Sequence, residues 1–125
     1  MIQLELPKPP TANNLFINLK HGGRAKSSDY KTWEHLAALD LGYHRAPTIT
    51  GRMKVEYLYG RHKDKRRRDI LNLEKALTDF LVKAQVIKDD CLIDDARLAW
   101  SDEVPEGRVR ITIVELEEEQ KCLGI

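Results

Sequence analysis

The sequence has 125 residues, of which 42% are hydrophobic and 33% charged, and its formal net charge is +1. This length and composition predict one soluble globular domain with a single modest core. No apolar run approaches the about 20 residues that cross a membrane. Two cysteines and four scattered histidines lack the spacing of a disulfide framework or a zinc site. The first residues lack the basic and apolar blocks of a signal peptide, so we expect a cytoplasmic protein.

Charge is unevenly distributed along the chain. Residues 61–68 carry six Lys or Arg and one acid, whereas residues 115–119 carry four Glu. A concentrated basic stretch can bind a polyanion even when the net charge is close to zero, because the local field decides. Charge alone leaves nucleic-acid binding and a solvated basic loop as alternatives.

The first elements in chain order are a strand and a polar loop. Ile2, Leu4 and Leu6 alternate with polar residues, which predicts a half-buried strand that ends at the prolines from Pro7 onward. The next segment, 11–14, is a loop by composition. Its amides, Asn13 and Asn14, could donate to a phosphate or a base, or satisfy the backbone of the turn.

A flexible basic loop is expected at 21–26. Ser27 or Ser28 can cap the helix that follows, which we place at about Ser28 to Tyr43 from its apolar stripe. Alternation from Met53 to Tyr59 predicts a strand, and Gly60 ends it.

The clearest element is a helix from about Leu71 to Gln85, with one wide apolar face. Asp69 lies at its start, where a carboxylate caps a helix and is favoured by the helix dipole by roughly 0.3–1 kcal/mol. Lys75 falls opposite the apolar face, so we expect it to be accessible.

The C-terminal part is predicted to contain two strands. Cys91 to Trp100 and Val109 to about Leu116 flank a turn at 105–107, and we interpret the pair as a β-hairpin. Residues 1–116 are expected to form one domain, and 117–125 an acidic tail that frays.

Basic residues followed by separated carboxylates suit metal-dependent cleavage of a phosphodiester. Mg²⁺ prefers oxygen ligands, usually one or two carboxylates with waters and phosphate oxygens, and a nearby lysine can stabilise phosphate charge. Asp69, Asp90 and Lys75 supply these groups. A 15-residue helix spans about 22 Å, so the chain must fold back if both acids are to meet one metal.

Several motifs together point to one family. They are Pro9–Asn14, the run from Arg66 to Ala76 with its D-x-x-N-L-x-K spacing, then Asp79, Leu81, Lys83–Ala84, Asp89–Asp90 and Gly107–Arg108. In this order they resemble the RusA family of Holliday-junction resolvases, endonucleases of phage origin.

The resemblance implies an α+β subunit with a small mixed sheet and two main helices packed on it, assembled as a homodimer. It implies Mg²⁺-dependent, paired symmetric nicks in four-way junction DNA during recombination and repair, with Mn²⁺ as a substitute metal, and a phage or prophage origin. Asp69 and Asp90 match the family's first and third catalytic acids, and Lys75 matches its essential lysine. The expected DNA-binding residues are Asn13, Asn14, Lys65, Arg66, Arg67, Arg68 and Asn72.

One residue departs from the family pattern. Leu71 stands where the family has its second aspartate, and leucine cannot ligate a metal. Glu74 is the first candidate to replace it as a metal ligand, and the other candidates are Asn72, Asp89, Asp94 and Asp95.

Three hypotheses therefore remain open. The first is a junction-selective endonuclease that uses Asp69, Asp90 and Lys75. The second is a catalytically impaired dimer that binds junctions without cutting them. The third is a protein-interaction module whose basic loop meets an acidic partner.

Overall fold

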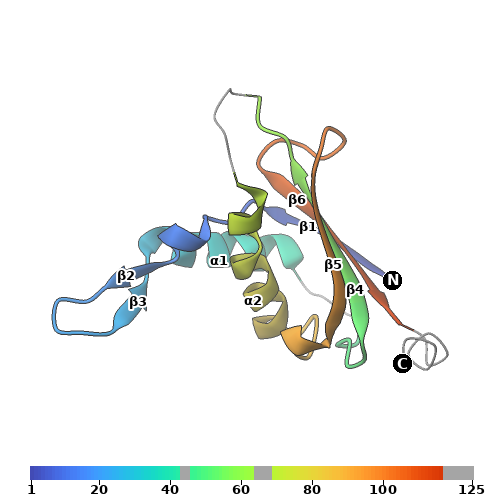
Figure 1. The fold of residues 1–125 in the computed structure, drawn as a ribbon, viewed down its shortest axis with the longest axis horizontal. Helices are drawn as coiled ribbons and strands as arrows, with labels where there is room; N and C mark the ends of the chain where they lie inside the picture. The colour runs from blue at the N-terminus through green and yellow to red at the C-terminus, as the bar shows by residue number, and fades with distance from the viewer. Residues whose placement is uncertain (43–45, 64–68, 117–125) are drawn as a thin grey trace.

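The computed structural model describes residues 1–42, 46–63 and 69–116. These form two sheets and two α-helices, with three short 3₁₀ helices (Figure 1). The strands are β1 (Ile2–Pro7), β2 (Phe16–Asn18), β3 (Arg24–Lys26), β4 (Met53–Gly60), β5 (Ile93–Ser101) and β6 (Arg108–Glu115). The helices are η1 (Ala12–Asn14), α1 (Ser28–Leu41), η2 (Ile70–Leu73), α2 (Lys75–Lys83) and η3 (Asp90–Leu92). No described helix is both long and apolar enough to cross a bilayer.

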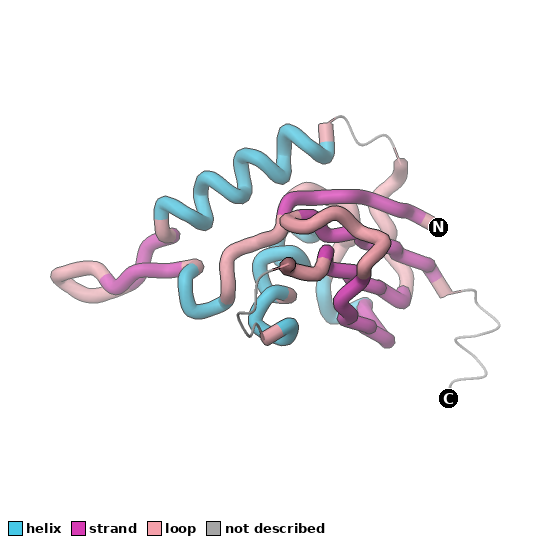
Figure 2. Tube along the Cα trace, turned by 90° about the horizontal axis from the view of Figure 1, so that it is seen from above, coloured by secondary structure: helices cyan, strands magenta, loops and turns pink. Residues whose placement is uncertain are grey.

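The main sheet is mixed, and β4 lies inside it. The strand order is β1-β6-β4-β5, in which β4 pairs antiparallel with β6 and parallel with β5. Both α-helices lie on one face of this sheet (Figures 1 and 2). The predicted α+β class, with a small mixed sheet and two helices, is thus confirmed.

The core lies between the helices and the inner face of the sheet. Met53, Val55, Tyr57 and Tyr59 of β4 are at most 2% exposed, and they alternate with residues of the open face. Helix α1 meets α2 through Trp33, whose ring packs edge-on against Phe80 at 5.5 Å. Burial of these side chains stabilises the helices on the sheet.

Two N-terminal predictions are confirmed and refined. The strand predicted at Ile2–Leu6 is β1, which pairs with β6. The cap of α1 is Ser27, whose hydroxyl accepts a hydrogen bond from the Tyr30 amide at 3.1 Å. The helix ends at Leu41, two residues before the predicted end.

The expected hairpin of the last two strands is wrong. β5 does not pair with β6, because β4 lies between them. β5 carries Asp94, Asp95 and Arg97, and charged side chains of this kind suit a strand at the edge of a sheet. Its connection to β6 passes the end of β4 at Gly60, where an added Cβ would lie 1.9 Å from the Pro105 carbonyl oxygen.

The predicted helix from Leu71 to Gln85 is divided. A 3₁₀ turn, Ile70–Leu73, precedes an α-helix that covers only Lys75–Lys83. The chain leaves α2 through Gln85, whose φ of +61° is left-handed, a common way for a helix to end.

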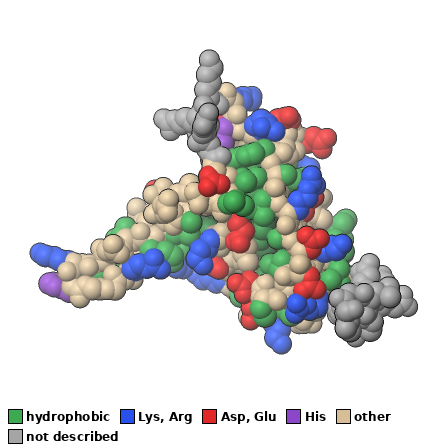
Figure 3. All heavy atoms as spheres, in the orientation of Figure 1, with side chains coloured by type: hydrophobic (Ala, Val, Ile, Leu, Met, Phe, Trp, Pro, Cys, Tyr) green, Lys and Arg blue, Asp and Glu red, His purple; other side chains and the backbone are tan. Residues whose placement is uncertain are grey.

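The predicted basic loop at 21–26 is part of a second, two-stranded sheet. β2 pairs antiparallel with β3, and the hairpin stands out from the rest of the molecule (Figure 3). The predicted tail, 117–125, and the basic residues Lys65, Arg66, Arg67 and Arg68 lie outside the described residues.

Candidate active site

Asp69 and Leu71 begin the segment that carries the predicted chemistry. The Asp69 carboxylate accepts a hydrogen bond from the Leu71 amide at 3.0 Å and so caps η2. The capping role considered from the sequence is therefore present, and the carboxylate remains at the surface. The Leu71 side chain is 73% exposed and does not enter the core.

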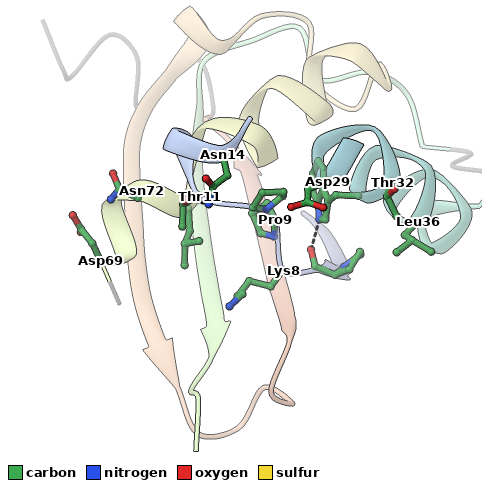
Figure 4. Close-up of a pocket in the computed structure, with 13 residues that line it drawn as sticks. Lys8, Pro9, Thr11, Asn14, Asp29, Thr32, Leu36, Asp69 and Asn72 are labelled. Carbon is green, nitrogen blue, oxygen red and sulfur yellow. Dashed lines mark hydrogen bonds between the residues drawn. The ribbon is translucent and has the colours of Figure 1, made fainter. Parts of the chain in front are cut away.

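Asp69 opens onto a groove of about 760 Å³ (Figure 4). Asp69 and Asn72 lie on one side of this groove, and Asp29 of α1 lies on the other. The N-terminal loop lies between them with Thr11 and Asn14, which are joined by a 3.1 Å hydrogen bond from the Asn14 amide to the Thr11 hydroxyl. The groove therefore combines these polar side chains with apolar ones, among them Pro9, Pro10 and Leu36.

A second, smaller cavity of about 300 Å³ lies between α2, η3 and the beginning of β5. Glu74, Lys75, Asp79 and Asp90 contribute its charged lining. The Lys75 ammonium lies 3.4 Å from the Asp79 carboxylate, and its side chain is 60% exposed. The predicted accessibility of Lys75 is confirmed, and it shares a cavity with Asp90.

The floor of this cavity is tied to the sheet. Tyr57 of β4 and Thr78 of α2 share a buried hydrogen bond of 2.6 Å between their hydroxyls. Burial raises the pKa of the Tyr57 phenol, so it stays protonated. This contact fixes α2, and therefore Lys75, against the centre of the sheet.

Asp89 and Asp90 form a pair of adjacent acids at the start of η3. The pKa of Asp89 is lowered, first by a hydrogen bond from the Cys91 amide, which measures 3.0 Å. The pKa of Asp90 is raised, because its side chain shares a hydrogen bond with Asp89 and faces that negative charge. Two carboxylates held this way create a concentrated negative charge that a cation would relieve.

The structure groups some predicted residues and separates others. Asp90, Lys75 and Glu74 line one cavity, whereas Asp69, Asn72 and Asn14 line the groove. Asn13 is exposed in η1 and does not line that groove. Within the described ranges, no set of three or more His, Cys, Asp or Glu could hold a metal ion.

Other residues of the two cavities were not predicted as site residues. Asp79 is one of them, and its spacing of four residues from Lys75 was a usable signal, because such pairs meet on a helix surface. Asp29 is another, and it comes to the groove only through packing of α1. Asp94, considered as a replacement ligand, instead binds Arg52 at 2.7 Å.

Comparison with known proteins shows the family to which this chain belongs. The family model for endodeoxyribonuclease RusA matches residues 7–114. The chain belongs to the RusA family. This match spans every residue that lines the groove and the cavity.

Relatives in the RusA family come from a phage and from enterobacteria. A crossover junction endodeoxyribonuclease of Enterobacteria phage HK97 is 46% identical over 54 residues, which are 43% of this chain and 45% of that protein. Proteins of the same name from Shigella sonnei and Escherichia coli K12 are 29% identical over 119 and 120 residues, or 90% of this chain and 93% of each relative. The phage relative fits the predicted phage origin.

Proposed function

We propose that this member of the RusA family is a crossover-junction endodeoxyribonuclease that makes paired nicks in four-way DNA. The family match supplies the class of reaction. The observation that supports cleavage is that Lys75 and Asp90 line one cavity. Lys75 offers a cation for a phosphate, and Asp90 offers an oxygen ligand for a metal.

Mg²⁺ fits the chemistry of this cavity. It takes few protein ligands, usually one or two carboxylates, with waters and phosphate oxygens completing its shell. Asp90 and Glu74 would hold it, with Asp69 reaching the same phosphate from the groove side. Mg²⁺ supplies an activated water and neutralises phosphate charge. Mn²⁺ would be the substitute.

The chain's own residues would then position the DNA. Lys75 would place its ammonium against the non-bridging oxygens of the scissile phosphate. Asn14 and Asn72 would donate to the strand in the groove, and the basic run at 65–68 would bind the backbone as it arrives. A homodimer would present two such sites to the junction, which paired nicks require.

A second function, junction binding without cleavage, is favoured by one observation. Leu71 occupies an exposed position at the start of η2, where the family's second acid would face solvent. A carboxylate there would join Asp69 at the same edge. Its absence predicts weaker metal binding, and hence slower cleavage.

The decisive experiment measures nicking of a labelled synthetic four-way junction. Wild-type protein, Lys75→Ala and Leu71→Asp would each be assayed with Mg²⁺ and with Mn²⁺, alongside gel-shift binding to junction, duplex and single-stranded DNA. The nuclease proposal expects symmetric nicks from wild type and none from Lys75→Ala, with junction binding retained. Tight binding without nicks in either metal would overturn it and support the binding function, and no DNA binding at all would favour an acidic protein partner.

Leu71→Asp measures how much the missing acid matters. We expect its nicking rate to exceed the wild-type rate by about 10- to 100-fold, the range seen when a group supporting a metal site is removed or restored. The exposed leucine buries only about a quarter of its side chain, so its loss costs under about 1 kcal/mol of stability. Leu39→Asp, at another exposed leucine that lines neither the groove nor the cavity, is the control and should leave the rate unchanged.

A further inference from the structure

The β2–β3 hairpin, residues 16–26 and here called the hairpin arm, has no role in the site described above. It is held to the body only at its base, where Ser27 donates its hydroxyl to the Asn14 carbonyl at 2.6 Å and the Phe16 ring contacts Tyr30 at 5.8 Å. Beyond its base it projects away from the sheet and helices (Figures 1 and 2). An arm exposed in this way is suited to contact a partner.

The arm carries charge of one sign. No Asp or Glu occurs between Leu6 and Ser28, whereas Lys20, Arg24 and Lys26 all lie in the arm. The face of the arm that Figure 3 shows has no acidic side chain. Lys26 is neutralised by Glu34 at 2.9 Å. That leaves Lys20 and Arg24, neither of which forms an ion pair with any residue the structure describes.

The arm also restrains one of these two cations. The Arg24 guanidinium lies over the Phe16 ring, 4.5 Å from its centre, and this cation–π contact favours that position of the side chain. The tip turns through Gly22 and Gly23, whose φ angles of +98° and +80° disfavour other residues. Side chains added at these glycines would meet nothing within 4 Å, so the backbone of the tip is open to close approach.

The base of the arm adjoins the groove. Asn14, which lines the groove, lies two residues before β2, and Asp29 lies three residues after β3. The three residues of β2 rise about 10 Å, and the turn at 19–23 extends the arm further. The strand alone matches about three phosphate spacings at roughly 3.4 Å per DNA strand.

We propose that the hairpin arm binds the phosphate backbone of the duplex that leads away from the cut site. This inference rests on the proposed junction-cleaving function. Lys20 and Arg24 contact phosphates, and the ribbon lies along a groove of the duplex, since the major groove admits a two-stranded β-ribbon. A protein partner fits less well, because the only large apolar side chains exposed on the arm, Ile17 and Leu19, offer far less than the about 800 Å² per partner of a stable interface.

The test is the salt dependence of junction binding, measured by fluorescence anisotropy over a range of NaCl concentrations. The double variant Lys20→Gln/Arg24→Gln should lower the slope of log K against log salt by about 1.8, or about 0.9 for each phosphate that the variant leaves unneutralised. The matched control is Lys54→Gln/Arg110→Gln, which removes one exposed lysine and one arginine from the open face of the sheet and should leave the slope unchanged. Circular dichroism would confirm that both variants fold.

The outcomes separate this inference from the function on which it rests. If wild type binds no junction, the proposed function fails. If wild type binds and the arm variant keeps the wild-type slope, or changes no more than the control, the arm does not bind DNA. A change of oligomeric state in sedimentation velocity, with the slope preserved, would assign the arm to a second copy of the chain and overturn the proposal as well.

Discussion

The hydrogen bond between Tyr57 and Thr78 allows the sharpest test of how the site is held. Thr78→Val keeps the shape of the side chain and removes its hydroxyl. The Tyr57 hydroxyl then stays buried at 1% residue exposure without this partner. Because Tyr57 and Thr78 both line the cavity of Lys75 and Asp90, the same change should loosen that cavity.

The expected magnitude follows from the asymmetry of buried hydrogen bonds. A buried hydroxyl left without a hydrogen-bond partner lowers the free energy of unfolding by about 1–3 kcal/mol, whereas removing both partners is nearly neutral. Thr78→Val should therefore lower the free energy of unfolding by about 2 kcal/mol. Tyr57→Phe should cost less, about 1 kcal/mol, because the Thr78 hydroxyl can turn to a carbonyl of its own helix. The double variant should be more stable than Thr78→Val alone.

Urea unfolding followed by tryptophan fluorescence measures these values, since the chain has two tryptophans and Trp33 is buried in the core. Tyr59→Phe is the matched comparison. The Tyr59 hydroxyl is buried with no hydrogen-bond partner among the described residues. Its removal should raise stability by about 1 kcal/mol. Full stability of Thr78→Val, or strictly additive losses in the double variant, would refute the reasoning.

Two further changes test other parts of the structure. Gly60→Ala should destabilise by several kcal/mol or prevent folding, because its Cβ would lie 1.9 Å from the Pro105 carbonyl oxygen, and a thermal melt against wild type shows this directly. Glu34 has a lowered pKa, because hydrogen bonds from Lys26 and Lys83 outweigh the opposing effect of burial. A lowered carboxyl pKa gives stability that is present above the unfolded value, 4.5, and is lost as the pH falls below it. Glu34→Gln should reduce this loss of unfolding free energy at acid pH, which unfolding curves measured at several pH values would show. An unchanged loss would contradict the ion pairs of Glu34 with Lys26 and Lys83.

The strands and helices with regular apolar spacing could be predicted from sequence. The alternation of β1 and β4, and the stripe of α1, each reflect one buried face, which a period of two or 3.6 residues reveals. The hairpin arm could not be found this way. Its strands have only three residues each, and their side chains are exposed or half-buried, so no buried face repeats along them.

Pairing was harder to predict than the elements themselves. Two strands joined by a short turn usually lie side by side, which suggested a hairpin of β5 with β6. The buried side chains of β4 instead place it between them. Gly60 ends β4 as predicted, and it is also the point at which the connection from β5 to β6 passes the end of β4.

The site was predicted in part. Resemblance and residue type both pointed to Asp69, Lys75 and Asp90. Which of them share a cavity depends on how α2 returns to β5, and no local pattern encodes that return. Lys75 and Asp90 line one cavity because η3 lies beside α2, while Asp69 faces the groove formed with the N-terminal loop.

The pairing of β1 with β6 also affects when the chain can finish folding. Ile2 lies opposite Ile113, so within the described sheet the strand that is synthesised first finds its partner in the strand that is synthesised last. Until then Ile2, Leu4 and Leu6 have no sheet to join, and β4 lacks its antiparallel neighbour. Because non-local pairing is slow and leaves apolar edges exposed, a nascent chain stalled before residue 108 should be a substrate for chaperones. The segment that carries Asp69, Lys75 and Asp90 would already be complete, but it would rest on an unfinished sheet.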